Sequence, residues 1–205
     1  MKFQVSAALL ALPLCAAAVE PQPFDYWLLS LSWSPQYCAQ GAPPGDPQCG
    51  SHRYGFVVHG LWPQNERGFP KNCPRPGRLP GDVIRRMLPL MPGPGLIQHE
   101  WNVHGACTGW PVNDYFEAVE NAYRSINIPR SYQSVAIYLN TSAAELESQF
   151  MQANPAHSAA SIALRCDGLY LQEVRLCLDK NFGARSCGAG VRHRCGGQVV
   201  LRPAK

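Results

Sequence analysis

The sequence predicts an α+β fold: one domain with a central, mainly antiparallel sheet flanked by helices. Strand-like and helix-like segments follow one another along the chain without a repeating βαβ rhythm. The 205 residues suit one domain, and 46% of them are hydrophobic, which is enough for a sizeable core. With 18 glycines and 19 prolines, the chain is too rich in helix breakers for a mostly helical bundle. The same composition excludes a disordered or collagen-like chain.

Two strands are expected in the N-terminal part. Residues 26–33 are aromatic-rich and partly alternating, which is typical of a strand. Residues 54–58 predict a second, buried strand that ends at His59-Gly60. Between these strands, residues 39–53 form a Gly/Pro-rich loop, and the prolines over 63–81 predict another loop.

Helical patterns dominate the middle of the chain. The expected helices cover 83–91, 96–106, 114–126 and a segment from Ser142 to about residue 153. Asp82 and Asn113 are candidate helix caps, and Ser142 with Glu145 forms a capping-box pattern. Further short strands are expected at 134–139, 161–165, 169–178 and 198–202.

The first residues resemble a secretory signal peptide. Lys2 precedes an apolar stretch and the small residues Ala16–Ala18, so we expect residues 1–18 to be removed and 19–205 to form the mature catalytic domain. Cys15 could mark a lipoprotein anchor, although Leu14 before it is larger than such a site prefers. No other segment has the length of a membrane span. We therefore expect a secreted or periplasmic protein, or one in a lysosome-like endomembrane compartment if the source is eukaryotic.

The cysteine count supports export. Removal of Cys15 leaves an even number, and disulfides persist in oxidising compartments. The absence of any C-x-x-C pair argues against a zinc ribbon or a thioredoxin-like site. We therefore expect four disulfides, whose pairing the spacing alone leaves open. Their cysteines are Cys38, Cys49, Cys73, Cys107, Cys166, Cys177, Cys187 and Cys195.

Two segments carry candidate chemistry, Phe56–Pro63 and His99–Cys107. In the first, His59 ends an apolar strand and a glycine follows at once. In the second, Glu100 and His104 are four residues apart and share one helix face, where a carboxylate can orient an imidazole and raise its pKa. Two imidazoles and a carboxylate can catalyse phosphoryl transfer by general acid–base chemistry. RNA carries its own nucleophile for this reaction, so neither cofactor nor metal is needed.

Simpler interpretations apply to most of the other candidates. Single histidines are more often structural, which is the interpretation favoured for His52, His157 and His193. Each of Trp62, Trp101 and Trp110 could be an ordinary core aromatic, and Cys107 is a better disulfide half than nucleophile. The zinc-protease pattern H-E-x-x-H is excluded because its second histidine would stand at Val103. A zinc site made by His59, Glu100 and His104 stays open as an alternative.

Both chemistry-bearing segments closely resemble the active-site segments of the ribonuclease T2 family. The resemblance extends to Leu31–Cys38, Ile162–Cys166 and Glu173–Asp179, and so covers nearly the whole mature chain. It implies an α+β fold and a metal-independent endoribonuclease of low base specificity. The implied products end in a 2′,3′-cyclic phosphate, which opens slowly to the 3′-phosphate. The implied disulfides are Cys38–Cys49, Cys73–Cys107, Cys166–Cys195 and Cys177–Cys187.

The resemblance also implies roles for five residues. His104 would be the general base on the 2′-hydroxyl, and His59 the general acid for the 5′-oxygen. Glu100 would lie against the phosphate and stabilise the transition state. His99 would bind phosphate, and Trp62 would stack on a base, which contributes about 1–3 kcal/mol.

One departure from the family pattern concerns Val103, where the family usually has a lysine. Loss of one preorganised stabilising group costs about 3–4 kcal/mol of transition-state stabilisation. Either another cation, such as Lys71 or Arg75, replaces it, or the protein retains the fold and works by binding RNA or a protein. Val103→Lys should raise kcat unless another cation already fills the role. Ala106 and Gln64 also depart from common family residues, so base preference stays open.

The weak net charge of +4 is compatible with an RNA substrate but does not require one. Basic residues between the two motifs could form a rim for phosphates, or simply a solvated loop and helix face. They are Lys71, Arg75, Arg78, Arg85 and Arg86. Asn140 begins a glycosylation sequon that matters only in a eukaryote. We expect a monomer.

Overall fold

A single six-stranded sheet organises the computed structural model, which describes residues 23–74 and 76–204. Its strands are β1 (Tyr26–Trp33), β2 (Phe56–Gln64), β3 (Leu139–Ser142), β4 (Ile162–Asp167), β5 (Tyr170–Leu178) and β6 (Gln198–Leu201). The strand order is β2-β1-β5-β6-β3, and β4 pairs with β5. Every one of these pairings is antiparallel except β5 with β6. The predicted α+β class with a mainly antiparallel sheet is confirmed; the expected signal peptide, 1–18, lies outside the described residues.

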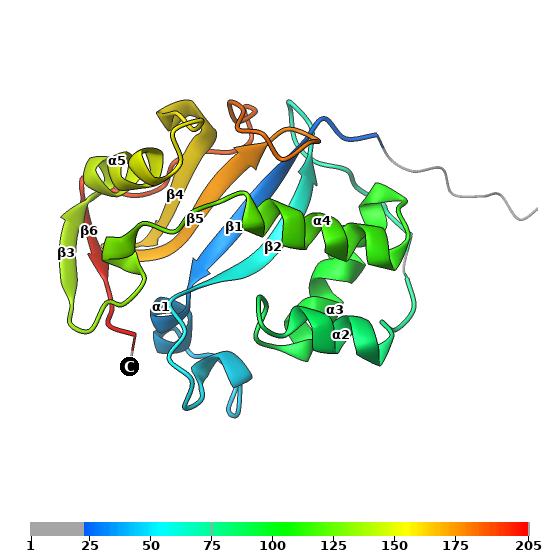
Figure 1. Cartoon of the computed structure of the whole chain (residues 1–205), viewed down its shortest axis with the longest axis horizontal. Helices are drawn as coiled ribbons and strands as arrows, with labels where there is room; N and C mark the ends of the chain where they lie inside the picture. Colours follow the sequence, from blue (N-terminus) through cyan, green and yellow to red (C-terminus); the bar gives the residue numbers. More distant parts are fainter. Residues whose placement is uncertain (1–22, 75, 205) are drawn as a thin grey trace, which may run out of the picture.

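Helices cover the sheet unevenly. They are α1 (Ser34–Ala39), α2 (Gly81–Met87), α3 (Pro94–Val103), α4 (Val112–Arg124) and α5 (Ala143–Ala153). Figure 1 shows α2, α3 and α4 gathered beside β2, whereas α5 lies at the other end near β3 and β4. Short 3₁₀ turns follow α3 at Gly105–Thr108 and occur at Pro47–Cys49, Arg130–Tyr132 and Ala159–Ser161. No helix in the described part of the chain is long and apolar enough to cross a membrane.

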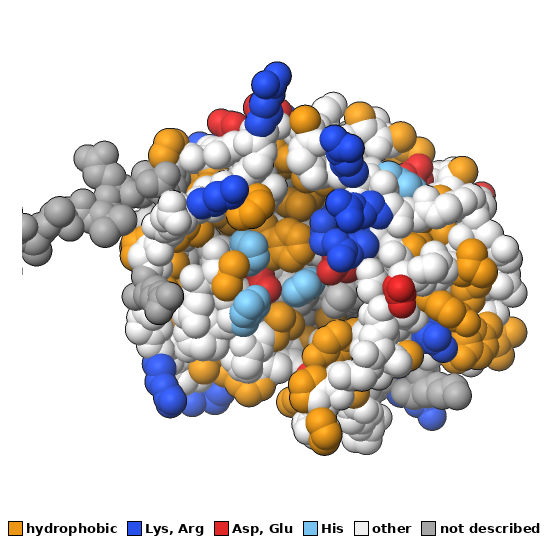
Figure 2. All heavy atoms as spheres, turned by 180° about the vertical axis from the view of Figure 1, so that it is seen from behind, with side chains coloured by type: hydrophobic (Ala, Val, Ile, Leu, Met, Phe, Trp, Pro, Cys, Tyr) orange, Lys and Arg blue, Asp and Glu red, His pale blue; other side chains and the backbone are white. Residues whose placement is uncertain are grey.

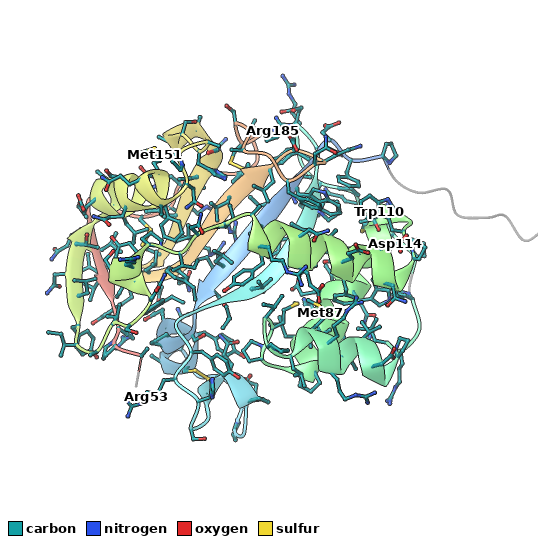
Figure 3. The ribbon with its side chains drawn as sticks, viewed as in Figure 1. Arg53, Met87, Trp110, Asp114, Met151 and Arg185 are labelled. Carbon is teal, nitrogen blue, oxygen red and sulfur yellow. A yellow bond between two sulfur atoms is a disulfide. The ribbon has the colours of Figure 1, made fainter. Side chains whose placement is uncertain are left out.

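The two faces of β1 have different environments because side chains alternate along a strand. Trp27, Leu29 and Leu31 are fully buried in the main core. The ring of Trp27 lies 6.5 Å from that of Tyr115, which belongs to α4. Met87, labelled in Figure 3 between α4 and the α2–α3 pair, is also fully buried in this core. The opposite face of β1, which carries Ser30 and Ser32, is therefore the side available for a functional site.

Several expected elements have different boundaries in the structure. The strand over 134–139 is wrong: the chain is irregular there until β3 begins. Val135 is buried but Ile137 is 78% exposed, so the apolar residues of the segment do not share one buried face. Helices α2 and α4 begin earlier than expected, and Pro80 and Pro111 occupy the cap positions assigned to Asp82 and Asn113. Proline suits a helix start because its fixed φ fits and its missing N–H is not needed there.

The C-terminal helix and strands follow the prediction. The Ser142 hydroxyl accepts the backbone N–H of Glu145 at 3.0 Å, so the predicted cap of α5 is present. Strands β1, β4, β5 and β6 lie where the patterns indicated. Helix α1 was missed because its six residues are too few to show a helical period.

All four implied disulfides are present. They join Cys38 to Cys49, Cys73 to Cys107, Cys166 to Cys195 and Cys177 to Cys187. The second of these ties the loop after β2 to the 3₁₀ turn that follows α3. That turn comes directly after His104, so this disulfide fixes the chain next to a predicted site residue.

Candidate active site

His59 lies within β2, not at the end of a strand as the sequence pattern suggested. The strand continues to Gln64 because Leu61, Trp62 and Pro63 pair with β1 despite the proline. The pairing register shifts between Ser30 and Leu31, whose partners are Gly60 and Val58, so His59 is the extra residue of a β-bulge. A bulge redirects a side chain and is common next to active sites. The predicted constrained position of His59 therefore arises from a bulge.

Glu100 and His104 reach the same place from α3. Helix periodicity puts Ile97 and Trp101 into the core with α4, which leaves Glu100 and His104 on the neighbouring face toward β2. The side chain of Glu100 is only 1% exposed, whereas that of His104 is 22% exposed. A buried carboxyl is thus held beside an accessible imidazole.

The carboxyl of Glu100 lies between both histidines. Its Oε1 is 3.6 Å from His59 Nε2, and its Oε2 is 3.9 Å from His104 Nε2. The indole N–H of Trp62 donates a 2.7 Å hydrogen bond to Oε2. Gly60 makes this arrangement possible, because a side-chain carbon there would overlap Glu100 and Trp62. The structure thus brings together the predicted residues His59, Glu100 and His104.

Trp62 packs against His59, His104 and Arg175 in addition to its hydrogen bond with Glu100. Its ring stacks on that of His104 at 5.1 Å and meets His59 edge-on at 5.3 Å. The guanidinium carbon of Arg175 lies 4.9 Å from its ring centroid. Trp62 is therefore a packing and hydrogen-bonding partner of the site, and its expected role as a base platform stays a prediction.

Two residues of the site were missed by sequence reasoning, Glu173 and Arg175 of β5. His59 Nδ1 lies 2.9 Å from Glu173 Oε1. Arg175 donates from Nε and Nη2 to the other oxygen of Glu173, at 2.7 and 2.6 Å. The available signal was the presence of two charged residues, two apart, in a strand of otherwise largely apolar residues. That pattern does not reveal which strands lie alongside, so it could not assign them to His59.

The environments of the two histidines push their pKa values apart. Burial acts to lower the pKa of His59, but the hydrogen bond to Glu173 and the charge of Glu100 outweigh it and raise this pKa. Burial and the charges of His59 and His99 lower the pKa of His104 to about 3. At mildly acidic pH, His104 is therefore neutral while His59 is protonated. A neutral imidazole can accept a proton and a protonated one can donate it, so the pair suits general acid–base chemistry.

The carboxyl groups also differ. Burial raises the pKa of Glu100 to about 7, although His59 and the Trp62 hydrogen bond oppose the rise. Burial acts to raise the pKa of Glu173 as well, but His59 and Arg175 overcome this effect and lower the pKa to about 2. Glu173 is thus a permanent anion against His59. Glu100 is largely neutral at acidic pH and can approach an anionic phosphate without strong repulsion.

A cavity of about 720 Å³ opens next to this centre. His59, His99, Glu173 and Arg175 line it, together with residues of the loop before α3. Figure 2, seen from behind Figure 1, shows histidine side chains gathered around a hollow beside a group of Lys and Arg side chains. His99 thus lies on the cavity wall with His59, as the predicted binding role requires.

The other candidates lie elsewhere. His157 is hydrogen-bonded to Ser161 at 2.9 Å, and His193 Nδ1 lies 2.8 Å from Glu147, which fits the structural interpretation of both. His52 borders a different cavity. Trp101 is a core residue, and Trp110 is 37% exposed.

The described basic residues between the two motifs, Lys71, Arg78, Arg85 and Arg86, do not line the cavity. Arg86 instead lies 3.6 Å from Glu120 of α4, and Lys71 lies over the ring of Phe69. The arginines that do line the cavity are Arg165 and Arg175, from β4 and β5. Arg75 lies outside the described residues.

The histidines and acidic residues do not form a metal centre in the described part of the chain. Among the described residues, no group of three or more histidine, cysteine, aspartate or glutamate side chains is arranged to hold a metal ion. The carboxyl of Glu100 instead lies within 3.6 Å of His59 and 3.9 Å of His104, and its hydrogen bond comes from Trp62.

Comparison with known proteins points to ribonucleases. A ribonuclease of Aeromonas hydrophila is 38% identical over 120 residues, which cover 57% of this chain and 54% of that protein. A probable ribonuclease of Haemophilus influenzae is 31% identical over 180 residues, which cover 80% of this chain and 61% of that protein. The chain thus spans between half and two thirds of the length of these two relatives.

The fold has solved counterparts. The structure of RNase NT in complex with 5′-AMP matches 89% of this chain and 100% of that one, with a TM-score of 0.67 and 24% identity. A family model described as the ribonuclease T2 family matches residues 24–187, which include β2, α3 and β5. The chain belongs to the ribonuclease T2 family.

Proposed function

We propose that the protein is an endoribonuclease that cleaves single-stranded RNA by transphosphorylation, with low base specificity and without a metal. The observation that carries this proposal is the pair of histidines with opposite pKa shifts on either side of one buried carboxyl group. Such a pair matches the needs of a reaction in which one group takes a proton while another supplies one. Membership of the family and the ribonuclease relatives support the same activity.

In the proposed first step, His104 removes the proton of the 2′-hydroxyl. The 2′-oxygen attacks phosphorus, the bond from phosphorus to the 5′-oxygen breaks, and His59 protonates the departing oxygen. The product ends in a 2′,3′-cyclic phosphate. In the slower second step, water replaces the 5′-oxygen with the proton transfers reversed, which yields a 3′-phosphate.

Glu100, His99 and Trp62 complete the proposed site. Glu100, largely neutral at acidic pH, donates a hydrogen bond to a non-bridging oxygen of the phosphate. His99, on the cavity wall, binds phosphate. Trp62 holds Glu100 through its N–H and offers its remaining ring surface to a base. Stacking on an aromatic ring tolerates any base, which supports low base specificity.

We further propose that the protein is exported, with residues 1–18 as the signal peptide and 19–205 as the catalytic domain, and that it acts as a monomer on RNA. The four disulfides support an oxidising compartment. N-terminal sequencing of the exported protein tests the cleavage position.

The activity is tested with purified mature protein and a homopolymer RNA in EDTA. We expect cleavage, products with 2′,3′-cyclic phosphate ends, and loss of at least about 100-fold of the rate in His59→Ala, because the general acid is removed. His193→Ala is the matched control, since His193 also contacts a glutamate but lies outside the cavity. Activity that disappears only in EDTA would instead support the zinc alternative.

A second candidate function is binding without cleavage. Val103 favours it, because the residue is 45% exposed and supplies no charge next to His104. Undetectable cleavage by the wild-type protein, together with retained affinity for RNA, would establish this function in place of the first.

A further inference from the structure

The proposed reaction needs a positive group that the α3 residues do not supply. Cleavage builds negative charge on the non-bridging oxygens of the phosphate, and preorganised donors lower the barrier most effectively. Helix α3 contributes His99 and Glu100, and the residue that caps its C-terminus, His104, is neutral at mildly acidic pH. Among the described residues that line the cavity, the permanent cations are Arg165 and Arg175.

Arg175 is held beside the catalytic centre from two sides. Glu173 accepts hydrogen bonds from its Nε and Nη2 through one oxygen, while the other oxygen of Glu173 contacts His59. The ring of Trp62 lies against its guanidinium. Trp62 in turn holds Glu100. Glu173 thus links Arg175 to His59, the proposed acid, and Trp62 links it to the buried carboxyl of Glu100.

The sheet register explains how Arg175 reaches this place. Arg175 of β5 is opposite Ser30 of β1, and Ser30 is opposite Gly60 of β2. Adjacent strands lie about 4.8 Å apart, so the side chain has to cross β1 to reach Trp62. The short side chain of Ser30 leaves room for it. This row of residues also lies on the face of β1 that the main core does not use.

Arg175 retains hydrogen-bonding capacity toward the cavity. Guanidinium has five N–H donors, of which Glu173 takes one from Nε and one from Nη2. Nη1 takes no part in the contacts that Arg175 makes with Glu173. The side chain is 19% exposed, so a ligand can reach it. Most of it is shielded from water, and a charge acts more strongly when it is shielded in this way. A planar guanidinium of this kind suits two-pronged binding of phosphate oxygens.

We propose that Arg175 binds the scissile phosphate of RNA and stabilises the charge of the transition state, while Glu173 and Trp62 hold its guanidinium in place. The proposal rests on the proposed ribonuclease function. It identifies the cation that Val103 does not provide. Arg165 is the weaker candidate: it is opposite Glu173 in the sheet register, but its Nε is bound to Gln172, whereas Arg175 makes the ion pair with Glu173 and lies over the ring of Trp62.

Arg175→Gln provides the direct test. We expect kcat on a homopolymer RNA to fall about 100- to 1000-fold, as for the loss of one preorganised donor. The matched control is Arg185→Gln. Arg185 also pairs with a glutamate, at 2.6 Å, and lies over a tyrosine ring, at 4.3 Å. It does not line the cavity, and it is labelled in Figure 3. The control should change kcat by less than about threefold, since an exposed ion pair contributes little.

Product inhibition separates phosphate binding from a structural role. We expect Arg175→Gln to weaken inhibition by uridine 3′-monophosphate at least about tenfold, because a charge-assisted contact is lost. Inhibition by uridine, which has no phosphate, should stay as in the wild type. Equal weakening for both probes, or for neither, would overturn the proposal.

A double variant removes the remaining ambiguity. In Arg175→Gln, the carboxylate of Glu173 loses the cation that pairs with it. The double variant Glu173→Gln/Arg175→Gln removes both charges of the pair. We expect kcat of the double variant to stay at least about tenfold below that of Glu173→Gln alone. Equal kcat values would mean that the unpaired glutamate caused the loss, and the proposal would fail.

The tests distinguish this proposal from the one that it extends. A wild-type protein without cleavage activity refutes the proposed function itself, whereas an active wild type with an unimpaired Arg175→Gln refutes only the role of Arg175. If Arg175→Gln does not fold, Arg175→Lys decides. Lysine keeps the charge but cannot bind two oxygens at once, so we expect weaker inhibition by the nucleotide with unchanged inhibition by uridine. Wild-type inhibition by the nucleotide would overturn the proposal.

Discussion

His59 is held between two carboxyl groups that have different effects. Glu173 lies 2.9 Å from Nδ1 and favours a proton on that nitrogen, which leaves Nε2 directed toward Glu100 and the reacting groups. Because the pKa of Glu173 is about 2, this carboxylate stays charged through the pH range in which His59 titrates. Glu173 is therefore a positioning residue that keeps His59 oriented and protonated.

Glu173→Gln should move the alkaline limb of the kcat/KM profile to lower pH. The proposed acid works in its protonated form, so activity is lost as pH rises through the pKa of His59. Removing the anion lowers that pKa, and the loss then occurs at lower pH. The pH dependence of homopolymer cleavage measures the shift.

Glu147→Gln is the control for this shift. Glu147 makes the same kind of contact to His193 Nδ1, at 2.8 Å, away from the cavity. Its profile should match that of the wild type. An unshifted limb in Glu173→Gln would show that Glu173 does not set the protonation of His59.

Val103→Lys tests the charge balance at the other end of the site. If Arg175 already neutralises the phosphate, a second cation next to His104 should raise kcat of the wild type by less than about threefold, since the stabilisation is largely present. The same change in Arg175→Gln should raise kcat by more. A rise above about tenfold in the wild type would mean that the phosphate lacks a cation in the native protein.

Strand β2 and helix α3 position the site as elements. The bulge at His59 turns its side chain, and the glycine after it lets Glu100 approach the strand backbone. On α3, the four-residue spacing of Glu100 and His104 was sufficient to predict their shared face, because a helix repeats every 3.6 residues. The bulge was not predictable, since it depends on how β2 pairs with β1.

Gly60→Ala should reduce kcat by about 100-fold, because displacement of a catalytic group by about 1 Å has effects of this size. The added carbon would overlap the carboxyl of Glu100 and Nε1 of Trp62. Homopolymer cleavage measures the loss, and a circular dichroism spectrum checks the fold. Gly77→Ala serves as control, since an added carbon there meets no atom within 4 Å. Wild-type activity in Gly60→Ala would contradict the tight Gly60–Glu100 approach.

At the scale of the whole molecule, two disulfides close long loops of the chain, one between a loop and a 3₁₀ turn and the other between β4 and the segment before β6. Cys73–Cys107 closes 34 residues that include α2 and α3, and Cys166–Cys195 closes 29 residues near the C-terminus. In the chain-entropy model, loops of this length contribute about 3.5–4 kcal/mol each to the free energy of unfolding. The two bridges should therefore contribute similarly to the free energy of unfolding, but only Cys73–Cys107 lies next to the candidate site.

Replacing both Cys73 and Cys107 with serine should therefore lower the free energy of unfolding by about 2–4 kcal/mol and also reduce kcat, because the chain after His104 is released. The Cys166/Cys195 pair of serine variants should lose similar stability with a smaller effect on kcat. Denaturant unfolding and cleavage rates, both at a temperature where each variant is folded, measure the two effects. Equal losses of kcat would show that the Cys73–Cys107 bridge has no special role at the site.

The sequence by itself determined the α+β class and the four-disulfide framework, and both are confirmed. It also singled out His59, His99, Glu100 and His104, whose proposed roles stay predictions. These signals are local: a strand pattern, a helix spacing, an even cysteine count and two short motifs. Only the tertiary structure decided that Glu173 and Arg175 belong to the same site. They lie more than 100 residues after His59, and the pairing of β5 with β1 and of β1 with β2 brings them there. A charged residue in a strand acquires its partner from the neighbouring strands, and that neighbourhood exists only after the sheet has formed.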